Sequence, residues 1–292
     1  SMRRTFSHGT EDQAGQEDAI AKEVMHEAVF VTNMHELRTN DDLDPHSIYY
    51  LNDAGQSGFF QYDPEDTASP DNTGTILVSE SGKRWKRMDY SGRYNIKWFG
   101  AKGDGETDDT EAIQAAINAA FRDGGGTVYF PKGTFIVSPR LDQCILLWSN
   151  VHLLGEGTNS TVKVKKDAGD YYTIFGQVGG SVYVENVRIS HLRIDQDPKN
   201  NTTCNIDRTN PARYYWQYSI HLGNYHNIVI DHVIFDEICG INTVKLSNPK
   251  SSYATITNCY FNFVMGKGDP EYDNSAIYLN GTNHIVANNV FY

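Results

Sequence analysis

A short pattern that recurs five times in the second half of the chain limits the possible folds most. Each copy reads polar, apolar, x, apolar, polar, polar, apolar, and successive copies begin 36, 41, 26 and 31 residues apart. Repeats of this length are typical of solenoids, in which each repeat forms one coil and stacks on its neighbours. The five copies are NVHLLGEG (150–157), NVRISHLRI (186–194), NIVIDHVIF (227–235), YATITNCYF (253–261) and HIVANNVFY (284–292).

The alternation inside each copy indicates β-strands rather than helices. A second strand-like element, SIHLGN (219–224) and AIYLNG (276–281), precedes two of the copies. Two or three short strands per coil predict a right-handed parallel β-helix over residues 94–292, because neither the helical period of ankyrin-type arrays nor the hairpins of propellers occur. Ile189, Ile230 and Ile256 should stack in its interior. Asn258 and Asn288 should occupy turns, where asparagine tolerates left-handed backbone.

One helix is predicted, over residues 108–121. Asp108 can cap it and Glu111 completes a capping box. A run of three glycines, 124–126, ends it. Its apolar side chains recur at helical spacing and form one stripe, which we expect to cover the N-terminal mouth of the β-helix. The stripe consists of Ile113, Ala116, Ile117, Ala120 and Phe121.

The chain before the β-helix divides into two parts. Residues 1–28 are polar and predict a flexible lead-in, whereas residues 29–93 hold short β-like runs between Gly, Pro, Asp and Asn turns and predict a small β module. The last repeat stops at Tyr292 without a cap for the open strand edges. We therefore expect the β-helix to be truncated at its C-terminal end.

Composition excludes some classes of partner. The formal net charge of −12 disfavours nucleic acid and anionic membrane surfaces as partners, and no apolar run approaches the length of a membrane span. The four cysteines lack the spacing of a zinc site and are interpreted as small core residues. The stretch DGETDDT (104–110) lacks the twelve-residue pattern of a calcium loop. No metal and no cofactor are predicted.

Two insertions between coils carry most of the candidate site residues, because long insertions in a solenoid gather on one side. The first spans 195–218 and the second spans 266–275, and each leads into a copy of the second strand. The first contributes Asp195, Asp197, Asp207, Arg208, Arg213, Tyr214, Tyr215, Trp216 and Tyr218. The second contributes Asp269, Glu271 and Asp273.

Alternation in the second strand predicts an outward column of His221 and Tyr278, with Asn242 or Lys245 between them. The aromatic side chains Tyr214, Tyr215 and Trp216 could stack on sugar faces, and Arg213 or Lys245 could pair with an acidic sugar.

The residue types in these insertions fit two kinds of sugar chemistry. In a hydrolase the general acid would be Asp269 or Asp273, with Asp207 and Glu271 as further candidate carboxylates. In a lyase His221 or Tyr278 would transfer the C5 proton of a uronic acid.

Residues 95–137 resemble the opening of the pectate-lyase-superfamily β-helix domain. The shared features are Phe-Gly-Ala (99–101), the turn Asp-Gly-x-Thr-Asp-Asp-Thr (104–110), the Ala-rich helix, the three glycines and Phe-Pro-x-Gly (130–133). This domain occurs in phage tail-spike depolymerases and in secreted bacterial polysaccharide-degrading enzymes, and the module before it resembles the small domain that often precedes it in tail-fibre-like proteins. The polygalacturonase-type set of Asn-Thr-Asp, Asp-Asp, His-Gly and Arg-x-Lys is absent. Residues 241–245 read INTVK, which has the Asn-Thr but Val where that set has Asp.

The resemblance implies a polysaccharide as partner and an extracellular location, whether secreted, at a cell surface or on a virion. It implies a homotrimer if the chain is tail-spike-like. We expect an enzyme, either a glycoside hydrolase or a polysaccharide lyase, that acts on a bacterial or plant-type glycan with acidic sugars. The alternatives are a non-catalytic glycan-binding spike or adhesin, and an N-terminal fragment whose catalytic coils lie beyond residue 292.

Overall fold

A computed structural model of the chain describes residues 29–88, 90–169, 171–179, 182–201, 217–262, 264–265 and 275–292. It divides into two compact units. The described part of the first is 29–71 with 76–88, and the second contains 72–75 and the chain from residue 90 onward. The predicted lead-in at 1–28 lies outside the described residues.

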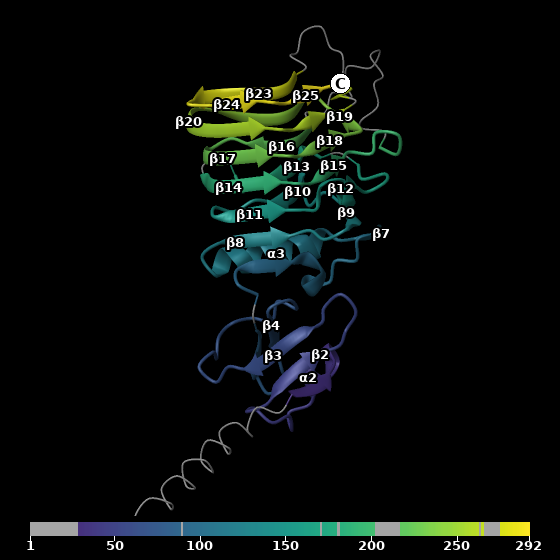
Figure 1. Cartoon of the computed structure of the whole chain (residues 1–292), viewed down its shortest axis with the longest axis vertical. Helices are drawn as coiled ribbons and strands as arrows, with labels where there is room; N and C mark the ends of the chain where they lie inside the picture. Colours follow the sequence, from purple (N-terminus) through teal and green to yellow (C-terminus); the bar gives the residue numbers. More distant parts are fainter. Residues whose placement is uncertain are drawn as a thin grey trace, which may run out of the picture. The chain divides into compact units, whose positions relative to one another are not determined.

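The first unit is a five-stranded sheet with strand order β1-β2-β3-β5-β4. Strands β2, β3 and β4 of this sheet are labelled in Figure 1. Its strands are β1 (Val29–Thr32), β2 (Ile48–Leu51), β3 (Gly58–Tyr62), β4 (Ile76–Val78) and β5 (Arg84–Arg87). A short helix, α2 (Met34–Thr39), begins at Asn33, whose side chain accepts the backbone N–H of Glu36. Leu37, Phe60 and Trp85 are fully buried together in the core of this unit.

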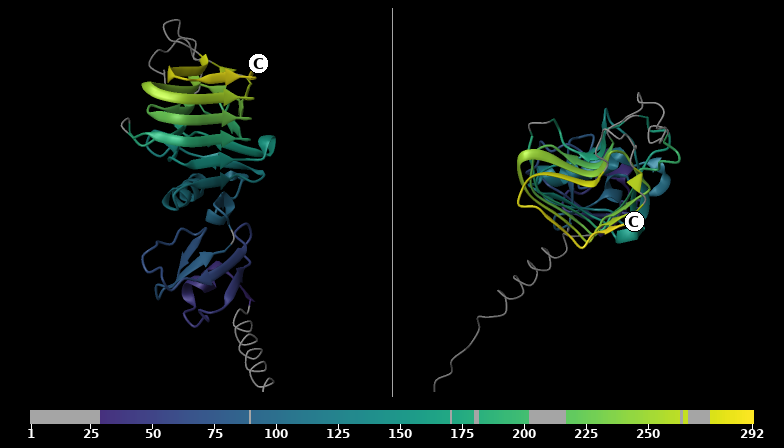
Figure 2. Two further views of the ribbon diagram at one scale, coloured as in Figure 1. Left: turned by 60° about the vertical axis from the view of Figure 1, so that its left-hand side comes forward. Right: turned by 90° about the horizontal axis from the view of Figure 1, so that it is seen from above.

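The second unit is a parallel β-helix, as the sequence predicts. All pairs of hydrogen-bonded strands in the described part of this unit run parallel. Successive coils stack along one axis (Figures 1 and 2). We call the three sides of the coil column 1, column 2 and column 3. Column 1 contains β10 (Gln143–Leu146), β13 (Thr173–Gly176), β16 (Tyr218–Leu222), the start of β20 (Asn242–Thr257) and β23 (Ser275–Thr282).

Columns 2 and 3 complete each coil. Column 2 contains β6 (Arg93–Asn95), β8 (Gly126–Tyr129), β11 (Val151–Leu154), β14 (Val184–Ser190), β17 (Tyr225–Asp231), the end of β20 and β24 (Ile285–Ala287). Column 3 contains β7 (Asp104–Asp108), β9 (Gly133–Val137), β12 (Ser160–Val164), β15 (Arg193–Asp195), β18 (Ile234–Asp236), β21 (Tyr260–Phe261) and β25 (Val290–Phe291). Outside the columns lie the pair β19 (Ile238–Cys239) and β22 (Val264–Met265), and the 3-10 turns η1 (Ile96–Phe99) and η2 (Gly157–Asn159).

The interior follows the repeat. Ile189, Ile230 and Ile256 pair in register on neighbouring coils and are fully buried, which confirms the predicted stack. The last copy needs one correction: Ile256 pairs with Val286, so the final repeat begins one residue earlier than its apolar pattern suggests. Turn residues Asn258 and Asn288 adopt left-handed backbone, with φ of 54° and 57°.

Helix α3 (Thr110–Arg122) packs against the first coils at one end of the β-helix (Figure 1). Its residues Ile113, Ala116, Ile117 and Ala120 are buried in the same apolar core as the strands, so the predicted capping helix is confirmed. Its start differs from the prediction. Asp109 rather than Asp108 is the N-cap residue, and its carboxylate accepts the N–H groups of the preceding loop instead of those of the helix.

One predicted member of the apolar stripe of α3 is not buried. Phe121 is 43% exposed and stacks on Trp148 at 4.9 Å. Among the described residues no helix is long and apolar enough to cross a membrane.

Candidate active site

Three of the predicted site residues form one outward row across column 1. His221 of β16 pairs in register with Lys245 of β20, and Lys245 pairs with Tyr278 of β23. Their strand neighbours Ile220 and Val244 are fully buried, so alternation along each strand directs His221 and Lys245 outward. All three side chains are half-buried. We call His221, Lys245 and Tyr278 the column 1 row.

Two tyrosines surround the imidazole of the column 1 row. Tyr172 meets His221 edge-on with ring centroids 4.9 Å apart, and Tyr218 stacks on it at 5.0 Å. The hydroxyl of Ser247 lies 3.4 Å from His221 Nε2, and the tautomer decides which atom donates. These contacts hold the imidazole between two aromatic rings, one stacked and one edge-on, and leave part of it accessible.

The ammonium of Lys245 is held over aromatic rings on both sides. Lys245 Nζ donates to the Tyr218 hydroxyl at 3.1 Å and lies 5.0 Å from the Tyr218 ring centroid and 5.6 Å from that of Tyr278. Such faces attract a cation while excluding water from it. Tyr218 itself is fully buried, so it positions Lys245 and does not face solvent.

Burial controls the protonation of this group. Burial, and then the charge of Lys245, lower the pKa of His221 to about 4, so the imidazole is neutral at pH 7. Burial also lowers the pKa of Lys245. For Tyr218, burial followed by the neighbouring Tyr172 raises the pKa well above its usual value, so the phenol stays protonated. The arrangement presents a neutral proton acceptor beside a cation.

The alternative member of the row, Asn242, does not belong to it. Asn242 is 5% exposed and donates to the hydroxyl of Ser275 at 2.7 Å. Its prediction as a substrate-binding residue therefore conflicts with its position, because Asn242 is buried and lies an odd number of residues before Lys245, on the opposite side of the strand.

Nine predicted residues of the two insertions lie outside the described residues, and their roles remain predictions. They are Asp207, Arg208, Arg213, Tyr214, Tyr215, Trp216, Asp269, Glu271 and Asp273.

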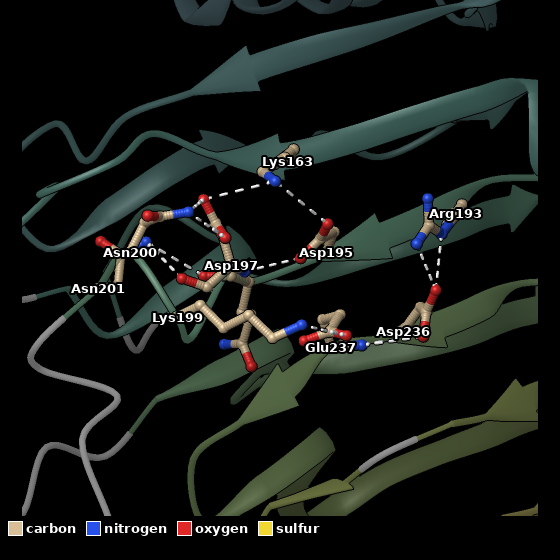
Figure 3. Close-up of polar contacts among 10 residues, drawn as sticks. Lys163, Arg193, Asp195, Asp197, Lys199, Asn200, Asn201, Asp236 and Glu237 are labelled. Atoms are coloured by element: carbon tan, nitrogen blue, oxygen red, sulfur yellow. Dashed lines mark hydrogen bonds and ion pairs between the residues drawn. The ribbon is translucent and has the colours of Figure 1, made fainter.

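A second polar group lies where β12, β15 and β18 of column 3 end (Figure 3). Lys163, Asp195 and Asp236 pair in register on three successive coils. Lys163 Nζ lies 3.6 Å from Asp195 and 3.4 Å from Asp197, and Arg193 forms an ion pair with Asp236 (Figure 3). We call these five residues the column 3 cluster.

The column 3 cluster is built as a structural support. The side chains of Asp195 and Asp197 are only 8% and 9% exposed, so little of either carboxylate can reach a polymer. Asp195 accepts the backbone N–H of Asp197 at 2.7 Å, and Asn200 donates to both oxygens of Asp197. Burial raises the pKa of Asp195, although the nearby Lys163 opposes that shift. The cluster fixes the chain where the first insertion leaves the coil.

Sequence reasoning missed Tyr172 and Lys163. Tyr172 comes directly before β13, and Lys163 lies on β12 in a strand whose alternation gives no sign of a partner. Register was the missing information, because the coils differ in length and only strand pairing shows which residues meet. Within the described ranges, no group of His, Cys, Asp or Glu side chains could hold a metal ion.

Comparison with known proteins identifies the family of the second unit. A family described as "Rhamnogalacturonase A/epimerase, pectate lyase-like" matches residues 93–292. The chain belongs to this pectate-lyase-like family. Residues 30–91, before the pectate-lyase-like region, match a "Phage tail protein small four-stranded beta-sheet domain". The predicted superfamily resemblance is therefore confirmed.

Individual relatives match shorter stretches. "Alginate lyase 7" of Azotobacter vinelandii is 52% identical over 80 residues, which are 26% of this chain and 9% of that protein. "Mannuronan C5-epimerase AlgE2" of the same organism is 44% identical over 119 residues, which are 39% of this chain and 12% of that protein. The matched stretches thus span about a tenth of these two relatives.

Solved structures share the fold. The tailspike gp42 of Acinetobacter phage vb_AbaP_AS12 aligns with a TM-score of 0.56 and 13% identity, over 88% of this chain and 43% of that one. At this identity the likeness concerns the β-helix architecture alone, since one fold hosts many activities.

Proposed function

We propose that the chain modifies an acidic, uronate-containing polysaccharide by removing the C5 proton of the sugar, as a lyase or as an epimerase. The observation that carries the proposal is the column 1 row, in which a neutral imidazole and an ammonium are in register on adjacent strands. The named activities of the alginate lyase and epimerase relatives, both of which act on uronans, support it.

The proposed chemistry assigns one task to each member of the row. The Lys245 ammonium pairs with the uronate carboxylate and stabilises the negative charge that develops when C5 loses its proton. His221, neutral at pH 7, accepts that proton. In elimination the C5–H electron pair forms the C4–C5 double bond, the C4–O4 bond breaks, and the Tyr278 hydroxyl protonates O4. In epimerisation Tyr278 instead returns a proton to the opposite face of C5.

Hydrolysis is the weaker alternative for the described part of the chain. A glycosidase needs two carboxyl groups that both reach the scissile bond. Asp195 and Asp197 are close enough to share one ammonium, but they are buried and held by it. The carboxylates predicted for a hydrolase, among them Asp269 and Asp273, lie outside the described residues.

We also propose that the protein acts outside the cell, as a secreted, cell-surface or virion protein. The phage-tail domain match supports this location. Cys239 is disulfide-bonded, which corrects its interpretation as a plain core cysteine, and disulfides persist in oxidising compartments. A homotrimer remains a prediction.

Product analysis tests the reaction. The 292-residue chain is incubated with alginate and with polygalacturonate, and the products are examined by mass spectrometry and NMR. The proposal expects C4–C5 unsaturated ends or a changed configuration at C5. Saturated products that have gained water would contradict it, as would unchanged polymers.

A further inference from the structure

One turn of the β-helix differs from its equivalents in the other coils by the size of its side chain. At the start of column 2, register aligns one turn residue from each of seven coils. All seven adopt left-handed backbone, with φ between 45° and 125°. They are Ser91, Gly125, Asn150, Asn186, Asn227, Tyr253 and Asn283. Six of them are serine, glycine or asparagine, and Tyr253 alone has a large side chain.

Tyrosine is a costly choice at this turn. Glycine has no Cβ, and asparagine tolerates left-handed backbone through local hydrogen bonds, whereas a bulky residue at φ 59° is strained. The asparagines also bond to one another: Asn186 donates to Asn150 at 3.1 Å, and Asn227 donates to Asn186 at 2.9 Å. At the next coil Tyr253 cannot continue this ladder.

Burial does not compensate for that strain. Tyr253 is 52% exposed, so its ring is presented to solvent rather than packed in the core. Its contact with the exposed His226 is edge-on, with ring centroids 5.3 Å apart and an interplanar angle of 80°. His226 Nδ1 is in turn fixed by the hydroxyl of Ser252 at 3.0 Å. One face of the phenol ring is therefore held in a defined orientation at the surface.

We propose that Tyr253 and His226 form a glycan-binding site, separate from the column 1 row, at which a pyranose ring stacks on the Tyr253 face. Backbone strain at an exposed residue is retained where it serves function. An aromatic ring offers a flat apolar face to the C–H side of a sugar. His226 and Glu185, which pair in register and are both exposed, supply hydrogen-bonding groups for sugar hydroxyls.

The site and the column 1 row share one strand. Lys245 and Tyr253 both lie on β20, eight residues apart, so at most roughly 26 Å of strand separates them. A polymer long enough to span that distance can engage both positions, and double engagement raises its apparent affinity. The inference rests on the proposed function only for the choice of glycan.

The test compares Tyr253→Asn with Tyr253→Phe, which keeps the ring. Binding is measured by affinity electrophoresis in gels containing alginate or polygalacturonate, which needs no turnover and stays informative if the proposed chemistry is wrong. Tyr253→Asn should bind polymer roughly two- to tenfold more weakly, and Tyr253→Phe should bind like the parent. Retardation of Tyr253→Asn equal to that of the parent would overturn the proposal, as would a parent protein that neither gel retards.

Stability supplies the second readout. An asparagine side chain at this turn would rejoin the asparagine ladder and relieve the strain, so Tyr253→Asn should raise the melting temperature by roughly 2–4 °C while it weakens binding. A variant that melts higher and binds less cannot have lost affinity through unfolding. A lower melting temperature would show that the ring supports the fold, and would overturn the proposed trade of stability for binding.

Discussion

The ammonium of Lys245 lies 3.1 Å from the hydroxyl of Tyr218, and the ring of that buried tyrosine stacks on His221. A single fully buried side chain therefore positions two members of the column 1 row, His221 and Lys245. Because Tyr218 begins β16, the first residue of this strand helps to set the geometry of the row.

Replacement of Lys245 by Met should reduce turnover of a uronan by roughly 10²–10³-fold, the scale of removing one group that stabilises developing charge. Lys250→Met is the matched control, since Lys250 is an exposed cation on the same strand β20. Initial rates at saturating polymer give the comparison. Equal rates for the parent and Lys245→Met would show that the ammonium takes no part in the reaction.

The pH dependence of the free energy of unfolding should reflect the lowered pKa of His221. Its pKa is about 4 in the folded chain and about 6.5 when unfolded, so the unfolded state binds more protons as pH falls between these values. Folding should thus lose on the order of 2 kcal/mol from this residue between pH 6.5 and pH 4. Urea unfolding of the parent and of His221→Gln across this window measures it. A difference between them that does not change with pH would contradict the assigned burial.

The pH dependence of activity should also follow the titration of His221. Only the neutral imidazole accepts a proton, so kcat/KM should fall as pH drops through about 4, the pKa of His221. If kcat/KM is constant down to about pH 3 in a chain that remains folded, the base is another residue.

The column 3 cluster should prove structural. Lys163→Met leaves Asp195 and Asp197 without their shared cation, and should cost about 2–3 kcal/mol because Lys163 is itself partly exposed. Turnover per folded molecule should stay near that of the parent. A loss of turnover without loss of stability would instead place these carboxylates in the reaction.

The fold could be predicted from the sequence because the repeating residues are apolar and point into the coil. Ile189, Ile230 and Ile256 are two residues from their next inward neighbours in every copy, and this spacing defines both strand and coil. The same logic selects His221 and Tyr278 as outward residues. Applied to the next coil, it also favours Lys245 over Asn242, because Asn242 lies two residues before the inward Val244 and shares its side of the strand.

Other features lie beyond single-sequence reasoning. Tyr172 and Lys163 become partners of the polar groups only through coil-to-coil register, and coil lengths differ. Similarly, Asp109 replaces Asp108 as the cap of α3 because the loop before the helix needs acceptors for two N–H groups, at 2.7 and 3.0 Å. A capping pattern of neighbouring residues gives no information about these N–H groups, because they belong to the loop before the helix.

Hydrogen exchange at C5 tests the central claim most directly. The chain is incubated with alginate or polygalacturonate in deuterated water, and NMR measures deuterium at C5 of residual polymer and products. The account predicts that epimerisation places deuterium at C5, that elimination leaves unsaturated ends that lack the C5 proton, and that either outcome is nearly abolished in His221→Gln and Lys245→Met. Polymer cleaved to saturated products with C5 protons fully retained, or equal C5 chemistry in both variants, would contradict it.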